Sequence, residues 1–174
     1  MKKLLLVIDM QNDFISGTLG TKEAILIVPK VIEKIVSFDG DIIYTKDTHT
    51  ADYKKTQEGK ILPVQHCVKG TDGWRLESTI EKLFLEKGCE GVEKVTFGAK
   101  NLPEIIQNKY PDGLEEIELV GLCTDICVIS NALLLKAFFP ETRIVVDSGC
   151  CAGVMPASHQ NALEAMKMCH IIVN

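Results

Sequence analysis

Cys127 combines a reactive side chain with a position that could activate it. It lies in the segment GLCTDICV at positions 121–128, which follows the acidic-then-apolar segment 115–120 and leads into the long apolar segment 126–139. The first segment predicts a short buried strand and the second a helix. A thiol in the first turn of a helix faces unpaired N–H groups and the positive end of the helix dipole, which favour the thiolate. Because the thiolate is the nucleophile, this position suits a catalytic cysteine; a small buried core residue is the alternative.

Two charged residues, Asp9 and Lys94, lie at or near the ends of other predicted strands, at 4–9 and 91–96. The carboxyl ends of parallel strands share one edge of a sheet, so both side chains can meet Cys127 there. A carboxylate can accept and return the thiol proton, and an ammonium group can stabilise a thiolate. Taken separately, Asp9 would serve as a cap and Lys94 as a solvated surface residue. Their shared placement with Cys127 favours a catalytic group of three.

A second cluster of chemically competent side chains falls in the predicted loop 47–73, where Asp47, His49 and His66 occur. One carboxylate and two imidazoles suit a divalent transition metal that keeps open positions for water or substrate. The Asp-x-His spacing places two ligands on one side of an extended segment, and a loop of this length usually has a function. We therefore expect one divalent metal ion, with zinc favoured and iron or manganese as alternatives. The side chain of Cys67 is expected to pack in the core rather than to bind the metal.

Short apolar strands alternate with helical segments along the whole chain. Strands are predicted at 4–9, 41–46, 91–96, 115–120, 142–147 and 170–173, and helices at 23–37, 75–86, 102–108, 126–139 and 156–168. This alternation predicts a single α/β domain, residues 1–174, with three layers: a six-stranded parallel sheet and helices on both faces. Pro29 predicts a local irregularity in the first helix, and Cys150 and Cys151 are expected to be small buried residues at a tight turn.

The composition excludes several classes of partner. The 174 residues carry a formal net charge of -5, which gives no electrostatic basis for binding nucleic acid or an anionic membrane. No segment approaches the length of a membrane span, and the N-terminal apolar run is too short for a secretory signal. Seven cysteines, an odd number, favour a reducing cytoplasm over a disulfide framework. The segment 16–22 fits no phosphate-loop pattern, so no organic cofactor is expected.

The predicted helix 126–139 is apolar on more than one side. A sheet can cover only one face of such a helix, so the pattern predicts a contact with another copy of the chain. We therefore expect a homo-oligomer.

Five stretches containing these residues resemble the cysteine-hydrolase branch of the isochorismatase-like family, and within it the nicotinamidases. They are VIDMQNDF at 7–14, KDTH at 46–49, PVQHCVKGT at 63–71, KVTFGA at 94–99 and GLCTDICV at 121–128. The resemblance implies a triad in which Cys127 attacks an amide carbonyl, Asp9 transfers the proton and Lys94 holds the thiolate. A thioester would form and be hydrolysed by water. The implied oxyanion hole uses the backbone N–H groups of Cys123 and Cys127, with a cis peptide between Leu122 and Cys123.

The resemblance also implies roles for the second cluster. Asp47, His49 and His66 match the family's metal ligands, whose ion binds the pyridine nitrogen of nicotinamide and so positions the substrate. Phe14 matches a position that stacks on the substrate ring. The tryptophan that many nicotinamidases carry before the histidine-cysteine pair has no counterpart in segment 61–66, and Trp74 is the one tryptophan of the chain.

The implied partner is a small-molecule amide, and the implied reaction converts nicotinamide to nicotinate and ammonia. An alternative keeps the triad and changes the substrate to another small amide, a carbamoyl compound or a ureido compound. A third hypothesis is a thiol-redox or metal-binding protein that uses Cys123, Cys127 and the loop histidines without hydrolysis.

Overall fold

The most apolar strand of the sequence lies in the middle of the sheet. In the computed structural model, which describes residues 2–174, β1 (Lys3–Ile8) pairs in parallel with β2 (Asp41–Asp47) and with β4 (Glu116–Leu122). Residues 4–8 are fully buried. Helices cover both faces of a parallel sheet, so a central strand has no solvent-facing side and needs no alternation of polar residues.

The remaining strands extend the sheet on either side of this centre. They are β3 (Glu90–Lys94), β5 (Arg143–Ala152) and β6 (Ile172–Val173), and the order across the described residues is β3-β2-β1-β4-β5-β6. All pairings are parallel, which confirms the predicted six-stranded sheet. The order of connection reverses between β1 and β4. The carboxyl ends of these two strands therefore form the edge where sites collect in open α/β sheets.

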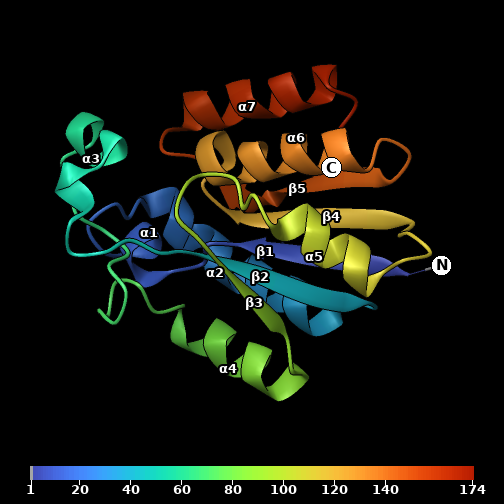
Figure 1. The fold of residues 1–174 in the computed structure, drawn as a ribbon, viewed down its shortest axis with the longest axis horizontal. Coiled ribbons are helices and arrows are strands. Elements are labelled where there is room, and N and C mark those ends of the chain that lie inside the picture. Colours follow the sequence, from blue (N-terminus) through green and yellow to red (C-terminus); the bar gives the residue numbers. More distant parts are fainter. Residues whose placement is uncertain (1) are drawn as a thin grey trace.

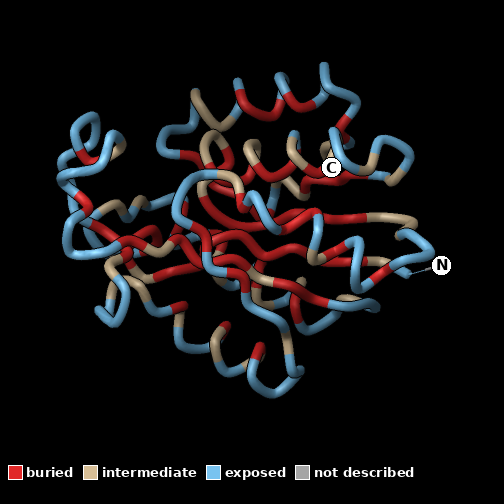
Figure 2. The backbone as a smooth tube through the Cα atoms, viewed as in Figure 1, coloured by how far each residue is buried: buried red, intermediate tan, exposed pale blue. Residues whose placement is uncertain are grey.

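Helices form a layer on each side of the sheet (Figure 1). One layer contains α1 (Asn12–Ile15), α2 (Lys22–Ser37) and α4 (Ser78–Lys87). The other contains α5 (Leu102–Lys109), α6 (Ile129–Phe138) and α7 (Pro156–Met168). Figure 2 shows the buried residues concentrated in the sheet and along the inward sides of the helices. The three-layer α/β class predicted from the sequence is confirmed.

Several predicted boundaries were wrong. The predicted helix 126–139 divides into a π-helical turn, η2 (Thr124–Val128), and then α6. The predicted helix 75–86 starts only at Ser78, because residues 75 and 76 pair with the segment after β1: Asn12 N–H donates to Arg75 O, and Gln11 bridges to Leu76.

Other expectations about local structure also need correction. Cys150 and Cys151 lie inside β5, not in a tight turn, because this strand continues five residues beyond the predicted end at 147. The long loop 47–73 contains a 3₁₀ turn, η1 (Tyr53–Lys55), and a short helix, α3 (Gln57–Ile61). Helix α2 continues through Pro29.

Within residues 2–174, no helix has both the length and the apolar character that crossing a membrane requires.

Candidate functional site

Asp9, Lys94 and Cys127 meet beyond the carboxyl ends of three strands. Asp9 follows β1, Lys94 is the last residue of β3, and Cys127 lies in η2 directly after β4. Lys94 Nζ lies 2.7 Å from Asp9 Oδ2 and 3.4 Å from Cys127 Sγ. All three residues are buried. The sheet therefore brings together a carboxylate, an ammonium group and a thiol that are distant in the sequence.

The Asp9 carboxylate is held in place by a neighbouring strand. Thr45 Oγ1 of β2 donates a hydrogen bond of 2.6 Å to Asp9 Oδ1, and the Asp9 N–H reaches the same hydroxyl at 3.3 Å. Burial raises the pKa of Asp9, and the negative charge of Asp47 raises it further, while Lys94 lowers it. A carboxyl group with a raised pKa is a stronger base, so Asp9 is suited to taking a proton from the thiol.

The surroundings of the Cys127 thiol act on its pKa in opposite directions. Burial raises the pKa of the Cys127 thiol well above its ordinary value, and the Asp9 charge adds to this effect, while Lys94 lowers the pKa. Burial therefore opposes the thiolate that the helix N-terminus was expected to favour, and Lys94 supports it. The expected role of Cys127 as a nucleophile stays a prediction, and a base beside the thiol would assist it.

The backbone around Cys127 has two uncommon features. The peptide bond between Leu122 and Cys123 is cis, as the resemblance implies, and η2 begins at the next residue. Gly121 has φ +116, and a Cβ atom there would lie 2.1 Å from Ile8 O. Only glycine therefore fits where β4 passes against β1. This close approach fixes the end of β4, from which Cys123 and Cys127 follow, against the end of β1, from which Asp9 follows.

The carboxylate and imidazoles of the second cluster also converge. Asp47 Oδ2 lies 2.8 Å from His49 Nε2 and 3.6 Å from His66 Nε2. Loop 62–71 pairs with the residues just after β2 through a parallel bridge between His49 and Val68, which brings His66 into place. One ligand atom from each of Asp47, His49 and His66 lies within 4.8 Å of the others. These distances leave room for one shared ion.

The donor atoms of this cluster fit a divalent metal. His49 Nε2 is buried and, within the described part of the chain, makes no hydrogen bond despite its short distance to Asp47. His66 Nδ1 bonds to Val64 O at 2.8 Å, which turns its Nε2 towards the cluster. Burial favours the neutral form of Asp47, but the adjacent imidazoles and Lys94 hold the pKa of this carboxyl well below its usual range. An anionic carboxylate and two free imidazole nitrogens are a donor set for zinc, iron or manganese.

Lys94 joins the two clusters. Its Nζ lies 3.2 Å from Asp47 Oδ1 as well as 2.7 Å from Asp9 Oδ2, and it donates to Thr96 O at 3.1 Å. Burial opposes its charge, yet Asp9, Cys127 and Asp47 together raise the pKa of Lys94 above its ordinary value. Lys94 is therefore a buried cation that contacts both the Cys127 thiol and the cluster of Asp47, His49 and His66, which is called the metal-type cluster below.

Sequence reasoning missed two residues beside the imidazoles. Glu58 in α3 places Oε1 3.7 Å from His49 Nε2 and 3.9 Å from His66 Nε2. Tyr53 is fully buried, with its ring 4.7 Å from the His49 ring and 4.9 Å from the His66 ring. Thr56 caps α3 by accepting from Gly59 N, a local signal that predicts a helical turn. No spacing rule connects that turn to the histidines.

Replacement of Glu58 by glutamine is expected to weaken zinc binding by about tenfold or more. Even residues that only support metal ligands contribute about 10- to 100-fold in affinity, and Glu58 adds a negative charge within reach of the ion. Zinc affinity can be measured by competition with a chromophoric chelator. Glu33→Gln, the same change at an exposed position of α2, is the matched control. Equal affinities for the two variants would contradict a role for Glu58.

The two aromatic residues considered for substrate binding lie in different places. The Phe14 ring is 5.5 Å from the His66 ring, so Phe14 lines the metal-type cluster. Trp74 Nε1 donates to Thr48 Oγ1 at 2.9 Å, and Lys46 Nζ lies 3.1 Å from the centre of the Trp74 ring. Side chains alternate along a strand, so contacts with Lys46 and Thr48 place Trp74 on the side of β2 opposite to the Asp47 carboxylate. Trp74 therefore does not replace the missing tryptophan.

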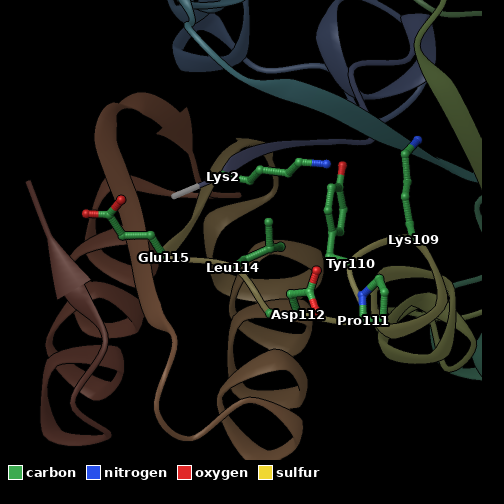
Figure 3. Close-up of a pocket in the computed structure, with 8 residues that line it drawn as sticks. Lys2, Lys109, Tyr110, Pro111, Asp112, Leu114 and Glu115 are labelled. Carbon is green, nitrogen blue, oxygen red and sulfur yellow. The ribbon is translucent and has the colours of Figure 1, made fainter.

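A cavity of about 310 Å³ lies at the opposite end of the sheet, lined by Lys2 and by residues 109–115 (Figure 3). Lys2 Nζ lies 5.7 Å from the centre of the Tyr110 ring, and Tyr110 Oη donates to Asp41 at 2.8 Å. Lys2 precedes β1 whereas Asp9 follows it, so this cavity is remote from Cys127. Tyr110 and Lys109 bond to Asp41 and Glu90, which lie outside the lining, and the cavity is not part of the candidate site.

Comparison with known proteins agrees with this geometry. The profile of the Isochorismatase domain matches residues 3–174. The nicotinamidase/pyrazinamidase of Mycobacterium tuberculosis is 27% identical, and the alignment covers 95% of this chain and 94% of that protein. The solved nicotinamidase/pyrazinamidase of Bacillus subtilis is 27% identical with a TM-score of 0.82, covering 99% of both chains. The solved N-carbamoylsarcosine amidase of Thermoplasma acidophilum is 26% identical with a TM-score of 0.77, covering 100% of this chain and 96% of that one.

Proposed function

This chain belongs to the isochorismatase family, and from that membership we propose that it is a metal-dependent cysteine amidohydrolase that converts nicotinamide and water to nicotinate and ammonia. One observation carries the proposal. Lys94 Nζ lies between the Cys127 thiol at 3.4 Å, the Asp9 carboxylate at 2.7 Å and the Asp47 carboxylate at 3.2 Å. A nucleophile with its base is thereby joined to a metal-type donor cluster.

In the first half of the reaction, the carboxylate of Asp9 takes the proton of the Cys127 thiol. The resulting thiolate attacks the amide carbon while the ammonium group of Lys94 stabilises its charge. The N–H groups of Cys123 and Cys127 donate to the oxygen as it becomes negative, and such donors are worth about 10²–10³ in rate. Asp9 then gives its proton to the departing nitrogen. The C–N bond breaks, ammonia leaves and a thioester remains on Cys127.

In the second half, Asp9 takes a proton from a water molecule, whose oxygen adds to the thioester carbon. The same two N–H groups receive the negative oxygen. The C–S bond then breaks, the acid is released, and the sulfur recovers the proton from Asp9. Both halves use one carboxylate in alternating roles, which a buried group with a raised pKa can fill.

Asp47, His49 and His66 would hold the metal ion, with Glu58 within reach. When bound, the ion would supply Lewis acidity, which would allow these residues to hold a pyridine nitrogen and so orient the ring. Zinc is the ion we favour for this donor set; iron and manganese accept the same donors. Phe14 and Tyr53, which pack against the His66 ring, form an aromatic wall beside that position.

A second candidate substrate is a small carbamoyl compound. The chain resembles a solved N-carbamoylsarcosine amidase over its full length, and segment 61–66 lacks an aromatic residue that would stack on a ring. The same triad would cleave the terminal C–N bond of such a substrate and also release ammonia. Comparison of nicotinamide with N-carbamoylsarcosine as substrates separates the two candidates.

Ammonia release from nicotinamide by the zinc-loaded protein tests the proposal. We expect release that disappears in Cys127→Ala and persists in Cys169→Ala, since Cys169 is an exposed free thiol far along the chain. Release from N-carbamoylsarcosine alone would transfer the assignment to the second candidate. No release from either substrate would reject the hydrolase proposal.

Two broader expectations remain part of this proposal. All seven cysteines are free thiols, which supports a reducing, cytoplasmic location. Helix α6 packs against α5, α7 and β5, so its own chain covers more of it than the sequence suggested. Leu133 and Phe138 remain exposed on α6, and these two side chains support a contact in a homo-oligomer.

A further inference from the structure

Gln11 and Asp13 are buried polar residues that the proposed mechanism does not use. They alternate with Asp9 along the segment that follows β1. Gln11 is fully buried, and Asp13 is 9% exposed. Burying a polar side chain is unfavourable unless it finds hydrogen-bond partners. Both residues bond to backbone groups in the segments that carry the candidate metal ligands; Gln11 also bonds to Trp74 O, and Asp13 also accepts from Thr18 N at 3.4 Å.

Gln11 replaces a missing strand partner of Asp47. The pairing of β1 with β2 ends at Val7 and Tyr44, and the chain then turns at Asp9, which has φ +45. Gln11 Oε1 accepts from Asp47 N at 2.7 Å, and Gln11 Nε2 donates to Asp47 O at 2.9 Å. The same Nε2 donates to Trp74 O at 2.9 Å. The side-chain amide thus bonds to both backbone groups of Asp47 and fixes where its carboxylate points.

Asp13 performs the equivalent task for the loop that carries His66. Asp13 Oδ2 accepts from Cys67 N at 2.8 Å, and Cys67 O accepts from His49 N at 2.9 Å. The backbone of Cys67 is therefore held on one side by Asp13 and on the other by the segment of His49. Because His66 is the preceding residue, this pair of bonds fixes the separation of the two imidazoles.

The space around the Asp13 carboxylate is set by two glycines. A Cβ atom on Gly73 would lie 2.1 Å from Asp13 Oδ2, and one on Gly17 would lie 2.6 Å from Asp13 Oδ1. The Asp13 N–H also donates to Gly73 O at 3.0 Å. A side chain at either position would therefore displace the Asp13 carboxylate.

We propose that Gln11 and Asp13 are positioning residues that hold Asp47, His49 and His66 in their metal-binding geometry before an ion arrives. The inference rests on the proposed function in so far as that function places a metal at these three residues. Partners that orient ligands in this way typically contribute about 10- to 100-fold in metal affinity. One five-residue segment, 9–13, would then contain the proton carrier Asp9 and both residues that position the metal ligands.

The experiment is a zinc titration of the metal-free protein against a chromophoric chelator. Gln11→Met removes the amide but keeps the length of the side chain, and Asp13→Asn keeps the shape but removes the charge. We expect each to raise the zinc Kd by about 10- to 100-fold. Asn12→Ala is the control. Asn12 lies between Gln11 and Asp13, but its Nδ2 donates to Asp72 O at 2.9 Å and not to a residue that carries a metal ligand. Its zinc affinity should equal that of the unsubstituted protein.

Gly73→Ala provides an independent variant, since it displaces the Asp13 carboxylate without altering Asp13 or any ligand. Like Asp13→Asn, it should raise the zinc Kd. Thermal melting of the metal-free variants separates positioning from general stability. If Gln11→Met and Asp13→Asn lower the Tm of the metal-free protein but leave the zinc Kd unchanged, the inference is overturned.

Zinc affinity is independent of turnover, so this inference and the proposed function can fail separately. Weakened zinc binding in variants of a protein that does not hydrolyse nicotinamide would support the inference and reject the substrate. Unchanged zinc binding in variants of an active hydrolase would overturn the inference alone. A failure of the unsubstituted protein to bind zinc would also overturn it.

Discussion

Replacement of Asp9 by asparagine is expected to lower kcat for amide hydrolysis by about 10²–10⁴-fold and to make Cys127 more reactive towards alkylation at neutral pH. Hydrolysis falls because the carboxylate that carries the proton in both halves of the reaction is lost. Alkylation rises because the Asp9 charge raises the pKa of Cys127, whereas Lys94 lowers it from 3.4 Å. Burial, the largest cause of the raised pKa, and the Asp47 charge remain, but without the Asp9 charge Lys94 is opposed less strongly. The thiol pKa therefore falls, and the thiolate fraction at pH 7 grows.

Two measurements check this pair of opposite effects: ammonia release from the substrate, and the rate of iodoacetamide labelling of Cys127 between pH 6 and pH 10. In the unsubstituted protein the labelling rate should still be rising at the alkaline end of this range. In Asp9→Asn the rise should shift to lower pH. Asp112→Asn makes the same chemical change at the remote cavity and should alter neither quantity. A labelling rate that falls together with hydrolysis would mean that Asp9 promotes the thiolate at rest, contrary to the geometry.

Removal of the metal is expected to reduce hydrolysis of nicotinamide by about 10²-fold or more while leaving Cys127 available for labelling. A misplacement of the reacting group by about 1 Å can cost a factor of this size, and without the ion Asp47, His49 and His66 no longer orient the ring. Dialysis against a chelator followed by the ammonia assay measures the loss. Added zinc should restore the activity.

A ligand variant gives the same test without a chelator. His49→Ala should reproduce the loss, and zinc should not restore its activity. His170→Asn removes a different, exposed imidazole at a position with φ +61, which asparagine tolerates. It should retain full activity. Unimpaired hydrolysis by the metal-free protein would remove the metal from the proposal and would favour a substrate that needs no ring orientation.

The elements that carry the site could be predicted because their signals are local. The apolar run of β1 and the alternation of strands and helices indicated a parallel sheet, and Asp9, Lys94 and Cys127 then fall at one edge by topology. Asp47 and His49 are two residues apart, so their convergence also follows from local geometry. His66 was predicted from its place in a long loop, and the resemblance then matched it to a metal ligand of the family.

Features that depend on distant segments could not be predicted. The direction of the Cys127 pKa shift depends on how completely β1, β3 and η2 exclude water from the thiol. No local sequence pattern predicts that degree of burial. Glu58 reaches the imidazoles because α3 folds back over the end of β2. Gln11 and Asp13 bond to backbone groups more than thirty-five and fifty residues away, respectively, and backbone groups leave no mark in a sequence.

The position of Lys94 on β3 makes the integrity of the candidate site depend on an edge strand of the sheet. Among the described residues β3 lies at the edge of the sheet, next to β2, and three of its five residues are exposed. Edge strands open in local fluctuations that require less free energy than unfolding of the whole molecule. When β3 opens, Lys94 moves away from the site. The carboxylates of Asp9 and Asp47 then lose the ammonium group that both of them contact. Heating is therefore expected to abolish activity at a temperature at which the core around β1 is still folded. Substitutions that stabilise the pairing of β3 with β2 should raise that temperature more than substitutions in the core.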